Sequence, residues 1–241
     1  MKNISYKLGG VVLAVIFGGQ IIAQGAPTLT LNDGVGNSVS LAVGGAPILT
    51  GSALTTFFQT GPGFVNWSGS LGVWSFNLGT GNTEPLQGTA QLPMMTLNFQ
   101  SNGNSAPGNL TFTWSDSNLG PTPGNDFMAQ IGGTLAAGVT LTYSTFYSLA
   151  NTMPAATPLN VPQTFNTPGG FNGSTTVNIG AVAAPYSLTQ VLLISNPTAA
   201  GTFSGNAQLI AVPEPASVAL LLGAGLGVAV MRSIRTARNR K

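Results

Sequence analysis

The sequence predicts an all-β domain, a two-sheet sandwich or jelly-roll-like fold, flanked by an N-terminal signal peptide and a C-terminal transmembrane helix. Two observations predict the β fold. Several segments alternate apolar and polar residues with a period of two, which is the pattern of a strand with one buried and one solvated face. Clusters of Gly, Pro, Asn and Ser separate these segments, and such clusters form turns. Hydrophobic residues make up 43% of the chain, which is enough to form a core.

The clearest alternation is in residues 95–100, where Met95, Leu97 and Phe99 share one face. The pattern recurs in residues 110–115 and 139–144 and, more weakly, in 28–31, 38–43, 54–59, 73–78, 176–179, 187–194 and 207–212. About ten short strands separated by turns are typical of a sandwich. No charge run or linker divides residues 26–211, so we expect them to form one domain.

Charge is distributed unevenly along the chain. All seven Lys and Arg residues lie close to the two ends, and the chain has no His. The five acids lie between these basic ends, at Asp33, Glu84, Asp116, Asp126 and Glu214. Because phosphate groups need Lys or Arg to neutralise them, we do not expect nucleic acid as a partner. Each carboxylate must be solvated, hydrogen-bonded or bound to a metal ion.

The predicted domain lacks the residues of the common catalytic sites. It has no Cys, His or Lys, so it cannot form Ser-His-Asp, Cys-His or Ser-Lys sites or the usual zinc ligand sets. We therefore predict no enzyme activity, no cofactor and no metal. The alternatives that remain use carboxylates. They are a glycosidase with Asp116 or Glu84 as an acid, and a calcium site.

Two loops contain possible calcium ligands. Asp116, Asn118, Asn125 and Asp126 lie in one predicted loop and would share an ion, although a solvated turn is the simpler interpretation. Residues 32–37 resemble a fragment of a calcium loop, and a hairpin turn is the simpler interpretation there.

Tryptophan offers a possible sugar-stacking surface. Trp67 lies between Gly63 and Gly69 in a predicted loop, so it is the candidate for an exposed ring. Trp114 alternates with Leu110 and Phe112, so we expect it in the core.

Residues 1–25 have the three parts of a secretory signal peptide. Lys2 and Lys7 supply the basic start, residues 8–17 are apolar, and small residues follow near a cleavage site. We expect Ala23 or Gly25 to be the last residue removed. An uncleaved membrane anchor is the alternative.

Residues 212–241 combine three features in order. The Pro213-Glu214-Pro215 motif is followed by the apolar run 218–231. A basic end then follows, with Arg232, Arg235, Arg238, Arg240 and Lys241. As a helix, residues 216–234 would span about 28 Å, close to the roughly 30 Å of a bilayer core. The basic end would then lie on the cytoplasmic side.

This arrangement resembles the PEP-CTERM sorting signal of Gram-negative bacteria, whose tail is also labelled an ice-binding protein C-terminal domain. The resemblance covers residues 212–241. It implies that an exosortase-type processing enzyme recognises Pro213, Glu214 and Pro215 while the apolar helix holds the precursor in the membrane. It also implies residence at the cell surface or in an extracellular matrix, with polysaccharide as a possible partner.

The sequence thus leads to a primary interpretation and two alternatives. The primary one is an exported, non-enzymatic cell-surface or matrix protein that is sorted by its tail. A carbohydrate-binding β-sandwich, with or without calcium, is the alternative, and a glycosidase that uses only carboxylates is the less favoured one. An exposed Trp67 near a polar face favours carbohydrate binding, and two carboxylates about 5–10 Å apart in a cleft favour the glycosidase.

Overall fold

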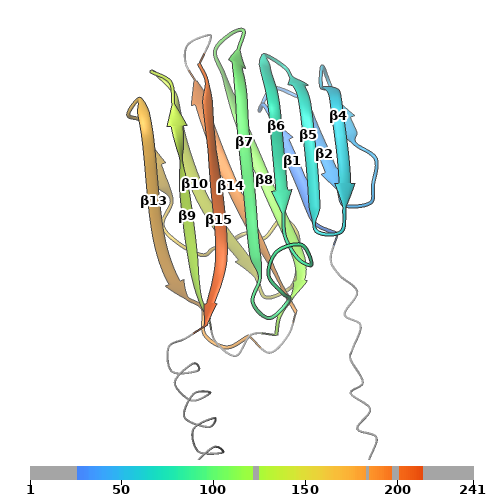
Figure 1. Cartoon of the computed structure of the whole chain (residues 1–241), viewed down its shortest axis with the longest axis vertical. Coiled ribbons are helices and arrows are strands. Elements are labelled where there is room, and N and C mark those ends of the chain that lie inside the picture. Colours follow the sequence, from blue (N-terminus) through green and yellow to red (C-terminus); the bar gives the residue numbers. More distant parts are fainter. Residues whose placement is uncertain (1–25, 122–124, 183–184, 197–200, 214–241) are drawn as a thin grey trace, which may run out of the picture.

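The computed structural model describes residues 26–121, 125–182, 185–196 and 201–213, which form two antiparallel sheets packed against each other (Figure 1). This confirms the predicted all-β sandwich. The predicted signal peptide and nearly all of the predicted tail lie outside the described residues, which end at Pro213. Within the described part, the chain has no helix of the length and apolar character needed to cross a bilayer.

The strands of the two sheets follow a regular order. The first sheet runs β11-β10-β14-β8-β1-β2-β3, with β12 also paired to β10, and the second runs β13-β9-β15-β7-β6-β5-β4. The bounds are β1 Thr28–Asn32, β2 Ser38–Ala42, β3 Ile48–Thr50, β4 Leu54–Gly61, β5 Phe64–Leu71, β6 Trp74–Asn82, β7 Met94–Asn104, β8 Gly108–Leu119, β9 Asn125–Leu135, β10 Thr140–Ser148, β11 Thr157–Pro158, β12 Gln163–Phe165, β13 Gly169–Asn178, β14 Tyr186–Asn196 and β15 Phe203–Pro213.

All ten predicted strand segments overlap observed strands, and two long strands were not predicted. β5 carries Gly69 at an inward position, and β9 contains the pair Gly132-Gly133, so glycine interrupts the apolar alternation in both. These glycines are required by close packing. An added Cβ on Gly69 would lie 2.0 Å from the carbonyl oxygen of Leu54, and one on Gly133 would lie 2.0 Å from that of Ser204.

Aromatic side chains from both sheets form the centre of the core. Phe112 of β8 contacts the rings of Phe76, Phe99 and Phe203 of the second sheet, at centroid distances of 5.7, 6.0 and 6.3 Å. Such edge-on and tilted contacts stabilise a core beyond simple burial. Trp114 is fully buried, as the alternation predicts.

The sandwich has two distinct ends. The turns 33–37, 72–73 and 105–107 lie at one end, which we call the turn end (Figure 1). The strand β1 begins at the opposite end, because Thr28 pairs with Ser115 near the end of β8. β15 finishes at this same end, where Pro213 pairs with Asn125. We call it the terminal end, since both ends of the described domain leave from it.

Candidate functional site

Trp67 is not exposed, which corrects the prediction of a sugar-stacking ring in a loop. It lies in β5 with 0% of its surface exposed, and its ring packs against Phe76 at 5.5 Å between centroids. The indole N–H donates to Thr55 Oγ1 over 2.9 Å. Its neighbours Gly63 and Gly69 suggested a loop, but Trp67 lies at an inward position of a strand and belongs to the core.

Asp116 and Asp126 do not share a site, which corrects the proposed calcium loop. Asp116 lies in β8 with 1% of its surface exposed. Asp126 lies in β9, in the other sheet, where its Oδ1 accepts a hydrogen bond of 2.9 Å from Asn178 at the surface. The two carboxylates thus have separate surroundings, one inside the sandwich and one at its surface.

Asn118 has a different role from the one predicted. It exchanges two hydrogen bonds with Asn151. The Asn118 backbone N–H donates to Asn151 Oδ1 over 2.8 Å, and Asn151 Nδ2 donates to Asn118 Oδ1 over 2.6 Å. Asn125, the fourth predicted ligand, begins β9. The predicted loop therefore consists largely of the ends of two strands. No cluster of three or more His, Cys, Asp or Glu occurs among the described residues.

The two carboxylates that do interact are Glu84 and Asp116. Burial raises the pKa of Asp116 to about 7, hydrogen bonds from Thr83 and Ser117 oppose this, and the charge of Glu84 adds to it. Burial also raises the pKa of Glu84. Because only 1% of the surface of Asp116 is exposed, a glycosidic bond cannot reach it, and the pair does not have the open geometry of a glycosidase.

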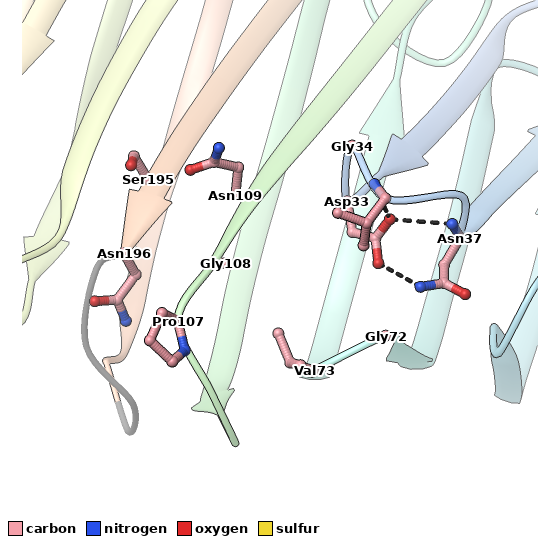
Figure 2. A pocket seen from close by; sticks show the side chains of 11 residues that line it. Asp33, Gly34, Asn37, Gly72, Val73, Pro107, Gly108, Asn109, Ser195 and Asn196 are labelled. Carbon is pink, nitrogen blue, oxygen red and sulfur yellow. Dashed lines mark hydrogen bonds between the residues drawn. The ribbon is translucent and has the colours of Figure 1, made fainter.

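A hollow of about 510 Å³ lies at the turn end (Figure 2). Figure 2 shows Asp33 and Asn37 on one side and Asn109, Ser195 and Asn196 on the other. Residues 33–37 join β1 to β2, as the hairpin interpretation predicts.

The carboxylate of Asp33 is used by its own turn. Its Oδ1 accepts the backbone N–H groups of Val35 and Asn37, each over 3.0 Å, and its Oδ2 accepts the Asn37 side-chain amide. Burial opposes ionisation of Asp33, but these hydrogen bonds outweigh it and lower the pKa below its usual value. The Asp33 carboxylate, the one charged group that Figure 2 labels at the hollow, therefore stabilises the hairpin. We consider the outer surface of the second sheet the better candidate site.

Amide side chains cover the outer surface of the second sheet, which faces the viewer in Figure 1. Because Leu97 and Phe99 of β7 point into the core, Asn98 between them points outward. The neighbouring strands repeat this arrangement. One row across the sheet reads Asn172, Gly132, Asn206, Asn98, Thr80, Asn66 and Gln59, and the next reads Ser174, Gln130, Gln208, Thr96, Asn82 and Phe64. We call these two rows the amide face.

Hydrogen bonds between neighbouring strands hold several of these side chains. Asn206 Nδ2 donates to Asn98 Oδ1, and Asn82 Nδ2 donates to Thr96 Oγ1 over 3.3 Å. Thr96 Oγ1 in turn donates to Gln87 Oε1 over 2.8 Å, and only 2% of the surface of Thr96 is exposed, so the groups open to a ligand are those of the other residues of the amide face. Each amide has two N–H donors and an oxygen with two lone pairs, so one such bond leaves further donors and acceptors free for a ligand.

Two aromatic side chains lie beside the amides. Phe57 of the edge strand β4 pairs with Ser68 on the outer surface and has 50% of its surface exposed. Phe64 belongs to the second row, and its ring lies over Gly61, where there is no side chain to prevent the contact. The amide face thus combines uncharged polar groups with aromatic rings at one edge, and none of its residues is charged.

The sequence contained the signal for this surface. The outward positions of residues 95–100 are Thr96, Asn98 and Gln100, and the same alternation gives the outward residues of the other strands. In the folded sheet, β15 and β6 place Asn206 and Thr80 on either side of Asn98. One segment of sequence cannot predict this, because strand order is a property of the whole sheet.

Comparison with known proteins gives few matches. No protein-family model and no curated protein matches the chain. Among solved structures, TmCBM61 in complex with β-1,4-galactotriose aligns with a TM-score of 0.30 and 9% identity, over 53% of this chain and 85% of that one. A cleaved adhesin domain of Lys-gingipain from Porphyromonas gingivalis aligns with a TM-score of 0.32 and 11% identity, over 67% and 94% of the two chains. Both are distant from this chain in sequence and in shape.

Proposed function

We propose that this chain is an exported, non-enzymatic protein that binds neutral polysaccharide through the amide face and is sorted by its PEP-CTERM-like tail. The amide face itself is the observation that supports this function. Sugar hydroxyls donate and accept hydrogen bonds, and Asn, Gln and Thr side chains offer both kinds of partner in fixed rows. Phe57 and Phe64 add apolar ring surface at one edge.

The dimensions of the amide face suit an extended chain rather than a small ligand. The surface crosses seven strands, and at about 4.8 Å between neighbouring strands it is about 29 Å wide. Binding across such a surface requires no deep pocket. It combines several weak contacts, each of which contributes about 1 kcal/mol when it is a hydrogen bond between neutral groups.

Charge favours neutral over acidic polysaccharides. Between Lys7 and Arg232 the chain contains five acidic residues and no basic residue. An acidic polymer would therefore be repelled, and it would find no cation with which to pair.

The tail is proposed to leave from the terminal end. The motif begins at Pro213, which also ends β15. β1 begins at the same end, so a membrane-anchored precursor would hold the domain by this end. The amide face would then run along the side of the domain, accessible to polymers of a surface matrix. Cleavage by an exosortase-type enzyme near Pro213, Glu214 and Pro215 would release or transfer the domain.

The binding proposal is tested by retention of the full chain on gels of neutral and acidic polysaccharides. We expect retention on at least one neutral gel and none on the acidic gels. The double variant Asn98→Ala, Asn206→Ala removes a cross-strand pair from the amide face and is expected to reduce affinity about 30-fold, from about two lost hydrogen bonds.

The matched control is Thr30→Ala, Thr113→Ala, which removes a cross-strand pair from the outer surface of the first sheet. We expect it to bind like the unmodified chain. Equal loss in both double variants, or retention on acidic gels alone, would contradict the assignment of binding to the amide face.

The tail proposal is tested separately in cells. Replacing Pro213, Glu214 and Pro215 together by Ala is expected to leave a protein that retains its tail in the membrane fraction, because the processing enzyme loses its recognition motif. Release of this variant at the same rate and mass as the unmodified chain would rule out sorting by the motif.

A further inference from the structure

The terminal end contains two buried carboxyl groups and a buried hydroxyl group that have no cationic neighbour. Glu84 follows β6 of the second sheet, while Asp116 and Tyr186 belong to β8 and β14 of the first sheet. The exposed fractions are 7%, 1% and 0%. No Lys, Arg or His occurs between residues 8 and 231, so no side chain from the domain can neutralise this charge.

Both carboxyl oxygens of Asp116 have a hydrogen-bond partner. Its Oδ2 accepts the hydroxyl proton of Thr83 over 2.6 Å, and its Oδ1 accepts the backbone N–H of Ser117 over 2.8 Å. The Thr83 hydroxyl oxygen can also accept a carboxyl proton, so this geometry fits either protonation state of Asp116. A buried ionised carboxylate without a positive partner is very unfavourable, so Asp116 needs either a proton or a cation from outside the chain.

Tyr186 supplies an independent indication of a missing partner. Its hydroxyl group is buried and makes no hydrogen bond with any described residue. The group lies within the electrostatic reach of Glu84, whose charge adds to the effect of burial in raising the pKa of Tyr186. A buried hydroxyl without a partner costs free energy unless a water molecule or a bound ion supplies one.

We propose that Glu84, Asp116 and Tyr186 bind a calcium ion at the terminal end of the domain. All three groups offer oxygen, and the surroundings contain no imidazole or thiolate, which selects a hard cation. Calcium tolerates irregular geometry and accepts backbone carbonyls and water as further ligands, whereas magnesium requires a near-ideal octahedron. Two carboxylates predict weak binding, in the range of about 0.1–1 mM that extracellular calcium modules show.

The ion would join the two sheets. Glu84 comes from the chain that leaves the second sheet, and the other two groups come from the first sheet. The domain has no Cys and therefore no disulfide. A calcium ion would crosslink the sheets at the end from which the tail leaves. This inference does not depend on polysaccharide binding and can fail without affecting it.

Protons compete with calcium at this site. The titratable groups here are Glu84, Asp116 and Tyr186, and the neighbouring ring of Phe127 in β9 does not titrate. Because burial raises the pKa of Asp116 to about 7, calcium is expected to bind more weakly at pH 6 than at pH 8.

The test is a calcium titration of the full chain in detergent, from about 10 µM to about 10 mM, which brackets the expected affinity. The thermal midpoint is measured in EDTA and at each concentration. The variants are Glu84→Gln and Tyr186→Phe, and the control is Asp126→Asn, which removes a surface carboxylate held only by Asn178. Tyr186→Phe keeps the ring that packs on Phe127 and so tests the hydroxyl group alone.

We expect calcium to raise the midpoint of the unmodified chain and of Asp126→Asn equally. Glu84→Gln and Tyr186→Phe should each need at least about 10-fold more calcium for the same shift of the thermal midpoint. Absence of a calcium-induced shift in the unmodified chain would overturn the proposal and mean that a proton neutralises the pair. A shift of unchanged size in Glu84→Gln would overturn it too, because the ion would then bind elsewhere.

Discussion

The hydroxyl group of Thr83 donates a 2.6 Å hydrogen bond to the carboxylate of Asp116, and both side chains are almost completely buried. Thr83 directly follows β6 of the second sheet, and Asp116 lies in β8 of the first. This contact between the sheets places a titratable carboxyl group where the domain has no cation. Its consequences for pH dependence can be measured.

In EDTA, we expect the free energy of unfolding to decrease as pH rises from about 4 to about 7. The folded state holds the proton of Asp116 up to its raised pKa of about 7, while the unfolded state releases it near 3.8. The stabilising contribution is therefore complete below pH 3.8 and is lost as pH rises through 7. Chemical denaturation at a series of pH values measures it.

Asp116→Asn is the control for this pH dependence. It keeps the shape of the side chain and cannot ionise, so the decrease between pH 4 and 7 should become smaller. Part of the decrease should remain in this variant, because burial also raises the pKa of Glu84. An unchanged pH profile in the variant would show that Asp116 is not responsible.

Trp67→Phe should reduce stability without affecting polysaccharide binding directly. The substitution leaves a cavity in the core and removes the hydrogen bond to Thr55, and we expect a loss of about 1–3 kcal/mol. Denaturant unfolding measures the loss. Retention on a neutral polysaccharide, measured well below the unfolding midpoint, should equal that of the unmodified chain. Lost retention in a fully folded variant would mean that Trp67 contacts sugar after all.

Gly81→Ala should destabilise the domain because the ring of Trp114 lies directly on Gly81. An added Cβ would come within 2.7 Å of the indole carbons, and the ring is held by its N–H bond to the Asn82 carbonyl over 3.2 Å. We expect a loss of about 1–3 kcal/mol from overpacking.

Gly79→Ala is the matched control for this substitution. Gly79 lies two residues earlier on the same strand, and its added Cβ would have no neighbour closer than 3.8 Å. We expect a change within about 1 kcal/mol, of either sign. Similar losses at the two positions, measured by thermal unfolding, would contradict the packing of Trp114 on Gly81.

Phe57→Ala should weaken polysaccharide retention and leave stability nearly unchanged. Half of the Phe57 surface is exposed on the edge strand, so its removal is expected to change the free energy of unfolding by about 0.5 kcal/mol or less. The natural control is Leu193→Ala, since Leu193 is similarly exposed but lies in β14 of the first sheet. Retention that falls equally in both variants would indicate a nonspecific apolar effect.

Alternation in the sequence was sufficient to predict the fold class and most long strands. Segments such as 95–100 and 110–115 carry large apolar residues at every second position, so the local pattern determines which side chains enter the core. The pattern failed at β5 and β9, where inward glycines fit against the backbone of a neighbouring strand. Such fits depend on contacts between segments that are distant in the sequence.

The candidate sites were harder to predict than the fold for the same reason. Asp116 was expected to share ligands with Asp126, its neighbour in sequence, but it interacts instead with Glu84 and Thr83, about thirty residues earlier. The amide face likewise depends on the order of seven strands. The alternation within a strand shows which residues point outward, but not which strands lie beside one another.

The most direct test of the central claim is hydroxyl-radical footprinting of the full chain with and without a neutral polysaccharide that retains it. Phe57 and Phe64 lie within or beside the amide face, and Met94 and Met128 border it on the same outer surface. Leu193 and Met153 report on the other side of the sandwich. We predict that the polysaccharide protects the first four side chains from oxidation and leaves the last two unchanged. Protection of Leu193 and Met153 instead, or equal protection on both sides, would contradict binding through the amide face.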